Sequence, residues 1–218
     1  MARPQPIVPP DLIAASTGTN GRPLSHRGAR TRRRLLEAAE QVFAELGYHD
    51  ASIVRITGAA GVAQGTFYLY FASKKDVFDE LVRDLNARVR HAMAEGASAG
   101  RTRAEVEELG FRAFFHFTAT HPALYRIIRQ AEFVSPEMLH YHYAKLAEGY
   151  VEGLRQAMTT GEATPGDPEV LAYALMGIGE LIGMRWILWN DTSEVPEPVF
   201  AEMAKIIRRT LGAAESGT

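Results

Sequence analysis

The stretch Ala60–Lys74, AGVAQGTFYLYFASK, decides the fold of this 218-residue chain. Ahead of it, Ser52 can cap a short helix with apolar residues at helical spacing, and Gly61 interrupts that pattern at a tight turn. A second short helix follows from about Gln64 to Tyr70. Two short helices joined by a three- or four-residue turn that contains glycine are typical of a helix-turn-helix.

The residue types of the second short helix suit contact with DNA, because its first residues would face base edges in the major groove. Gln64 and Thr66 are short polar readers, and the hydroxyls of Tyr68 and Tyr70 can reach phosphates. Lys74 lies at the start of the next helix, where free N–H groups also favour a phosphate. The predicted DNA-binding residues are Arg32, Arg33, Ser52, Arg55, Gln64, Gly65, Thr66, Tyr68, Leu69, Tyr70 and Lys74.

The run from Gly47 to Lys74 resembles the signature of the TetR family of transcriptional regulators, and the resemblance is specific over about residues 31–82. In that family the recognition helix usually begins Val-Ser-Lys/Arg-Gly-Thr and ends Tyr-His-Tyr-Phe. Here Ala63, Gln64 and Leu69 replace the serine, the basic residue and the histidine. The resemblance implies a DNA-reading role for Gln64, Thr66, Tyr68, Tyr70 and Lys74. Leu69 is suited to a thymine methyl group. These departures leave the recognised DNA sequence open.

The charge distribution also favours DNA at the N-terminal end. Residues 1–83 hold 11 Lys and Arg against 8 Asp and Glu, whereas the remainder holds 13 against 18, which suggests that the front half meets a polyanion. Residues 1–30 are rich in Pro, Gly, Ser and Thr, so we expect a flexible basic tail. The arginine run Arg30 to Arg34 is expected to supply affinity with little base specificity.

The apolar periodicity is helical along the chain, and strand alternation is missing from the sequence. We therefore predict an all-α fold, with an N-terminal three-helix helix-turn-helix domain and a larger C-terminal helical domain. The first helix is expected from Thr31 to Leu46, with Gly47 as a left-handed cap. The predicted parts are a tail at 1–30, the DNA-binding domain at 31–76, a ligand-binding and dimerisation domain at 77–212, and a tail at 213–218.

The segment Glu169–Trp189 is apolar on nearly every face, and a monomer of this size rarely encloses such a helix. We therefore expect a partner surface and a homodimer, with internal core packing as the alternative. Gly179 and Gly183, four residues apart, would permit close helix–helix approach. Glu180 and Arg185 would be costly in lipid, so we expect no membrane partner.

The family resemblance also implies an inducer pocket in the C-terminal domain. The run His121–Phe133 resembles a segment of family members that respond to fatty-acyl or aryl-acyl CoA thioesters, and Arg126 and Arg129 share one face with phosphate-binding geometry. Aromatic residues at helical spacing are as readily plain core as pocket lining. The candidate ligand-binding residues are Phe114, Phe117, Tyr125, Arg126, Ile128, Arg129, Phe133, Tyr143, Leu146, Tyr150, Leu181, Arg185 and Trp186.

Other functional classes find little support. The chain lacks cysteine, which excludes disulfides and thiolate metal sites, and its proline-rich start has no apolar signal-peptide core, so we expect a cytoplasmic protein. Metal-ligand spacing and nucleophile motifs are also missing, so we predict no metal, no cofactor and no enzyme activity. We expect a ligand-responsive regulator, released from double-stranded operator DNA by a small apolar effector. The alternative is a DNA-binding regulator or architectural protein without a small-molecule ligand.

Overall fold

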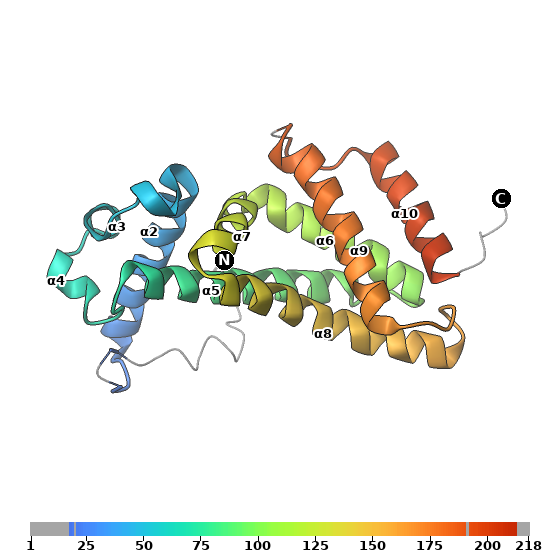
Figure 1. Ribbon diagram of the computed structural model, residues 1–218, viewed down its shortest axis with the longest axis horizontal. Coiled ribbons are helices and arrows are strands. Elements are labelled where there is room, and N and C mark those ends of the chain that lie inside the picture. Colours follow the sequence, from blue (N-terminus) through green and yellow to red (C-terminus); the bar gives the residue numbers. More distant parts are fainter. Residues whose placement is uncertain (1–17, 20, 191, 213–218) are drawn as a thin grey trace, which may run out of the picture. The chain divides into compact units, whose positions relative to one another are not determined.

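The computed structural model describes residues 18, 19, 21–190 and 192–212, and every regular element within them is a helix (Figure 1). This confirms the predicted all-α fold. The helices are α2 (His26–Asp50), α3 (Ile53–Ala60), α4 (Gln64–Phe67), α5 (Lys74–Ala97), α6 (Arg103–Thr120), α7 (Ala123–Val134), α8 (Pro136–Thr160), α9 (Pro168–Gly183), the π-helical turn η1 (Met184–Leu188) and α10 (Glu197–Leu211).

The chain divides into two compact units. The head unit comprises Met1–Arg88 and Arg126–Leu139, and the body unit comprises Val89–Tyr125 and His140–Thr218. The predicted boundary at residue 76 was therefore too early. The first half of α5 belongs to the head because Phe78 is fully buried and packs edge-on against Phe43 of α2, with ring centroids 5.4 Å apart.

Aromatic residues from α2, α4 and α5, and from the turn that follows α4, form the core of the head unit. Phe43 and Phe78 lie beside Tyr48, while Phe67 and Phe71 pack together with ring centroids 5.5 Å apart. Burial of each such ring stabilises the fold by about 1.5–3 kcal/mol. Because Phe67 is on the short helix α4 itself, this core fixes the orientation of that helix.

Helix α2 begins earlier than the sequence predicts. Ser25 is its N-cap, and the Ser25 hydroxyl accepts a hydrogen bond from the Gly28 amide at 3.2 Å. The tail prediction was therefore wrong for residues 26–30, which form the start of this helix, whereas residues 1–17 lie outside the described residues. Gly47 has the expected positive φ of 75°, but its ψ of 166° makes a kink, and a last turn continues to Asp50.

The body unit is built around a core shared by α6, α8, α9 and α10. Its largest members include Phe111, Tyr150, Leu175 and Phe200. Asp167 caps α9, since its carboxylate accepts hydrogen bonds from the Glu169 and Val170 amides, and proline follows at the first position.

The two glycines of α9 face this internal core. A Cβ at Gly179 would overlap the Phe111 ring, and one at Gly183 would overlap the Tyr125 hydroxyl. The close approach that these glycines permit is therefore made within the subunit, to α6 and to the start of α7.

The opposite face of α9 remains exposed, with Val170, Tyr173 and Leu181 on it. The segment Pro168–Leu188 is long and apolar enough to span a membrane by length and composition, a test that core helices of soluble proteins also pass. Here Glu180 on this segment accepts a hydrogen bond from the Tyr143 hydroxyl at 2.7 Å. The apolar segment therefore has one side that is buried in the body core and an opposite side whose apolar residues are exposed.

Candidate DNA-binding and effector sites

The turn between α3 and α4 has the geometry that the sequence predicts. Gly61 is in the left-handed conformation, with φ 63° and ψ 41°, and its amide donates to the Gly58 carbonyl at 3.1 Å. Arg34 of α2 donates a hydrogen bond to the Ala60 carbonyl just before the turn. The turn is thus stabilised by a hydrogen bond within its own backbone and by the hydrogen bond from Arg34 of α2.

The second helix of the motif presents most of its predicted readers to solvent. Gln64, Tyr68 and Leu69 are exposed, Leu69 at 61%, while Phe67 and Phe71 point into the core. The regular part of the helix spans four residues, and turns continue to Tyr70, so it is shorter than predicted. Gly65 is also exposed, and Thr66 and Tyr70 are half-buried.

At the start of α3, Ser52 is the N-cap and accepts a hydrogen bond from the Arg55 amide at 3.2 Å. Arg55 itself is exposed, next to Val54, which is also exposed. Sequence reasoning missed Val54 as a surface residue of the motif. The signal was present, because Val54 lies off the apolar stripe formed by Ile53 and Ile56.

Lys74 has a structural role that the sequence did not reveal. Its ammonium donates to the carbonyls of Tyr48 at 2.7 Å and Ala51 at 2.8 Å, and it lies 4.4 Å from the centre of the Tyr48 ring. The side chain therefore ties the start of α5 to the end of α2. The contact of Lys74 with a DNA phosphate stays a prediction. To make it, the ammonium group would have to bind the phosphate while it keeps these hydrogen bonds, or give one of them up.

Arg32 and Arg33 are ion-paired on a helix, which corrects the expectation of arginines on a flexible arm. Arg32 bonds Glu80 at 3.1 Å and covers the Phe71 ring, and Arg33 bonds Asp84 at 3.1 Å. Both pairs brace α2 against α5. Their guanidinium groups are consequently less available to DNA than the sequence suggested.

We expect Gln64→Ala to change the base preferred at one position of each half-site. The side chain is exposed at the first turn of α4, so its removal should cost contact with a base and little stability. A bidentate contact of an amide with adenine provides about 1–3 kcal/mol of discrimination. Selection from randomised DNA with wild-type and variant protein measures this. An unchanged sequence preference would remove Gln64 from the readers.

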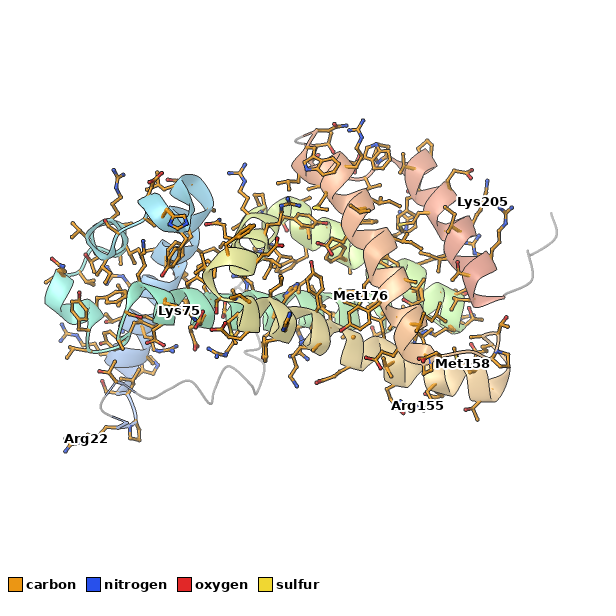
Figure 2. All side chains as sticks on the ribbon, in the orientation of Figure 1. Arg22, Lys75, Arg155, Met158, Met176 and Lys205 are labelled. Carbon is orange, nitrogen blue, oxygen red and sulfur yellow. The ribbon has the colours of Figure 1, made fainter. Side chains whose placement is uncertain are left out.

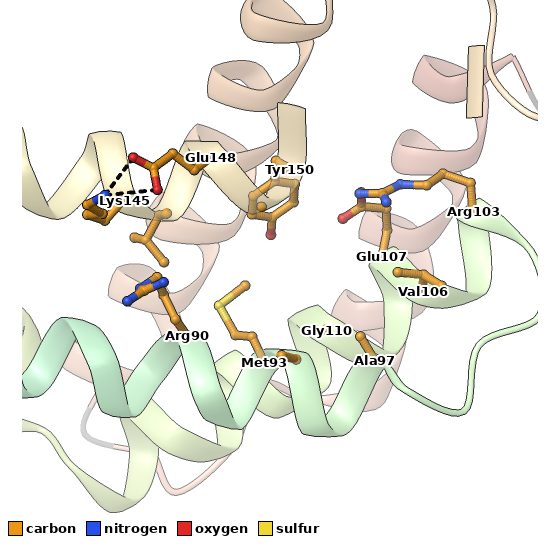
Figure 3. A pocket seen from close by; sticks show the side chains of 13 residues that line it. Arg90, Met93, Ala97, Arg103, Val106, Glu107, Gly110, Lys145, Glu148 and Tyr150 are labelled. Carbon is orange, nitrogen blue, oxygen red and sulfur yellow. Dashed lines mark hydrogen bonds and ion pairs between the residues drawn. The ribbon is translucent and has the colours of Figure 1, made fainter. Parts of the chain in front are cut away.

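The body unit contains a pocket of about 510 Å³ that is open to solvent (Figure 3). Helices α5, α6 and α8 form its walls. Its lining is mainly apolar, with charged groups among it. The lining residues are Arg90, Met93, Ala94, Ala97, Arg103, Val106, Glu107, Gly110, Lys145, Leu146, Glu148, Gly149 and Tyr150.

Four of the charged groups of this pocket form two ion pairs. Arg103 bonds the buried Glu107, and Lys145 bonds Glu148 at 2.8 Å. Burial raises the pKa of the Glu107 carboxyl above its usual value, and the Arg103 charge opposes that rise. Burial also raises the pKa of the Tyr150 phenol, which stays neutral, and Figure 3 shows its hydroxyl directed into the pocket. The site can therefore hold an apolar group and offer a hydroxyl to a polar one.

Only two of the predicted ligand-binding residues, Leu146 and Tyr150, line this pocket. Phe117 is buried and stacks on His121, with ring centroids 4.3 Å apart, and Tyr125 is buried edge-on against Phe114. These rings fill the core of the body unit. Periodicity identifies the apolar faces of helices, but it does not distinguish side chains that pack in the core from side chains that line a pocket.

The other predicted ligand-binding residues are also dispersed. Tyr143 lines a separate hollow of about 460 Å³, and Leu181 is exposed on α9. Arg185 bonds Asn190 and lies over the Trp186 ring at 5.5 Å. Arg126, Ile128, Arg129 and Phe133 belong to the head unit.

Within the head unit, Arg126 donates to the Ala44 carbonyl at 3.2 Å, and Phe133 is 81% exposed. Ile128 is buried and Arg129 is exposed. The pocket residues that sequence reasoning missed include Arg90, Arg103 and Glu107. The four-residue spacing of Arg103 and Glu107 at a helix start was the available signal.

Comparison with known proteins places these features in a family. Residues 35–81 match the family model described as "Bacterial regulatory proteins, tetR family". The HTH-type transcriptional regulator YdgC of Bacillus subtilis is 45% identical over 67 residues, which are 31% of this chain and 34% of that protein. The fatty acid metabolism regulator protein of Bacillus subtilis is 30% identical over 128 residues, which are 58% of this chain and 66% of that protein. The chain thus spans from about a third to just under two thirds of these curated relatives.

The fold continues beyond the matched segment. The crystal structure of the regulator FadR from Bacillus subtilis in complex with stearoyl-CoA superposes with a TM-score of 0.71 at 21% identity, over 84% of this chain and 99% of that chain. That likeness establishes a common fold for both the helix-turn-helix and the helical body. The family match thus assigns the helix-turn-helix of this chain to the TetR family of bacterial regulatory proteins, and the helical body shares the fold of that solved regulator.

Proposed function

We propose that this protein is a cytoplasmic transcriptional repressor that binds operator DNA as a homodimer and is released by a small apolar effector. The observation that carries the proposal is the placement of the recognition segment. Phe67 and Phe71 anchor it in the head core, while Gln64, Tyr68 and Leu69 are left exposed. Such a surface has no structural purpose in an isolated subunit and suits the major groove.

The homodimer is supported by the outer face of α9. Val170, Tyr173 and Leu181 are exposed there, and Ile206 is exposed on α10. Apolar side chains gathered on one side of a helix favour association with a second copy of the same surface. Two heads held by one dimer would read two half-sites with centres about 10 bp apart, or a multiple of that spacing.

The effector is proposed to bind in the pocket lined by Met93, Val106 and Leu146. An apolar tail needs an apolar wall, and a charged head group needs cations nearby; Arg90 and Lys145 line this pocket, and Lys145 would have to exchange its ion pair with Glu148 for one with the head group. The relative named for fatty acid metabolism and the neighbour solved with stearoyl-CoA support an acyl-CoA thioester. The pocket also favours this sensor over an architectural DNA-binding protein, which would need no cavity.

We expect acyl-CoA thioesters to release the protein from its operator, with release that strengthens as the acyl chain grows. Each methylene buried in the pocket should contribute up to about 0.8 kcal/mol, or about fourfold in the dissociation constant. Titration of free CoA, a series of acyl-CoAs and phenylacetyl-CoA against the operator complex measures this.

Leu146→Trp fills the pocket and should abolish the response without affecting DNA binding, because Leu146 lies in the body unit. If cationic compounds or flavonoids release the DNA and no thioester does, the acyl-CoA assignment is wrong and the sensor function stands. If no small molecule changes DNA binding, the sensor function itself is wrong.

A further inference from the structure

A short segment ahead of α2 is attached to the end of the recognition helix. We call residues 18, 19 and 21–24 the arm. The Thr19 amide donates to the Leu69 carbonyl at 3.2 Å, and the Thr19 hydroxyl donates to the Tyr68 carbonyl at 3.0 Å. Carbonyls at a helix end lack partners inside the helix, and here Thr19 supplies them. The position of the arm is therefore set by the recognition segment.

The arm also has a turn of its own. The Gly18 amide donates to the Arg22 carbonyl at 3.0 Å, and the Gly21 amide donates to the Gly18 carbonyl at 2.9 Å. Gly21 has a φ of 70°, which side chains rarely adopt. This turn brings Arg22 to the outer edge of the head unit, as Figure 2 shows. The arm is thus an ordered element with a cationic side chain in a defined place.

The sequence around the arm is rich in arginine. The sequence between Asp11 and Glu37 contains six arginines and no acidic residue. Three of these arginines are engaged on α2, as described above. Arg27 and Arg30 are exposed and make no ion pair with any residue that the structure describes. Clustered like charges repel one another, so this arrangement favours a polyanion beside it.

We propose that the arm is a second DNA-contacting element, which leads from the recognition helix across the phosphate backbone to the adjoining minor groove. The proposal rests on the proposed function. Tyr68 and Leu69 are the exposed residues where the arm is attached, so DNA that meets them also lies next to Arg22. Arginine side chains are favoured in the narrow minor groove of A·T-rich DNA, where the negative potential is strongest.

The test uses the full-length protein and a duplex site that the wild type selects from randomised DNA. Arg22→Ala with Arg27→Ala should lower the slope of log affinity against log salt by about two, since each phosphate contact contributes about 0.9. Methylation of minor-groove adenines flanking the half-site by dimethyl sulfate should be blocked by wild-type protein and not by this variant.

Thr19→Val tests the attachment of the arm separately from its charge, because it removes the hydroxyl that bonds the Tyr68 carbonyl and keeps the arginines. We expect it to lose the flank protection while its salt slope stays at the wild-type value. The matched controls are Arg101→Ala and Thr159→Val, two exposed residues of the body unit, which should change neither readout. The arm proposal is overturned if the arginine variant binds the selected site with wild-type slope and flank protection. A wild-type protein that selects no DNA site overturns the proposed function instead.

Discussion

Leu181→Glu should convert the protein from a dimer to a monomer and weaken operator binding by at least about a hundredfold, since linked binding events gain about 10²–10⁴ in avidity. Leu181 is 59% exposed on the outer face of α9, near the C-terminal end of the helix. In the proposed dimer it would be buried against the partner copy. A carboxylate placed there would lose its hydration in the interface.

The subunit itself should remain folded, because the substituted side chain contributes to the surface of an isolated subunit. Phe133→Glu is the matched control, since Phe133 is an exposed apolar residue of the head unit, whereas α9 belongs to the body unit. Sedimentation equilibrium gives the oligomeric state, and fluorescence anisotropy gives the affinity for the full site and for one half-site. A Leu181→Glu protein that stays dimeric, with wild-type helicity and wild-type operator affinity, would contradict the proposed interface.

The local elements of the head could be predicted because their signals are local. Ser52 caps α3, and Ser73 caps α5 with Asp76 bonding back toward the cap, as the spacing of these residues indicates. Gly61 takes the left-handed conformation that the turn requires. These features depend on residues within four positions of each other, and sequence spacing determines which of them can meet.

Contacts between residues far apart in the sequence could not be predicted from it. The Gln130 side chain accepts a hydrogen bond from the Tyr48 amide, 82 residues away, and thereby fills the gap left by the kink at Gly47. The pocket wall likewise joins Met93, Glu107 and Tyr150 from three helices. Helical periodicity establishes that a face is buried, but the partner of that face depends on the packing of whole helices. This explains why only two of the predicted ligand-binding residues line the pocket, whereas others, such as Phe117 and Tyr125, are buried elsewhere.

The same limit applies to the glycines of α9, for which the sequence favoured a partner surface and left packing in the core as the alternative. Gly179→Ala and Gly183→Ala should each destabilise the subunit by about 1–3 kcal/mol, because each new methyl group overlaps a ring that is already packed. The double variant should lose about twice that and unfold at clearly lower denaturant concentration. Gly177 lies on the outer face of the same helix, between Tyr173 and Leu181, and a methyl group there meets nothing within the subunit; in the isolated subunit Gly177→Ala should stabilise the helix by up to about 1 kcal/mol.

Denaturant unfolding at several protein concentrations distinguishes the two locations of these glycines. A core location predicts that the loss of stability is the same at every concentration, since it arises within one subunit. An interface location predicts a loss that shrinks as the concentration rises, because mass action then restores the dimer. If Gly179→Ala and Gly183→Ala behave like Gly177→Ala, the packing of α9 on Phe111 and Tyr125 is wrong, and so is the assignment of the opposite face, with Leu181, to the partner.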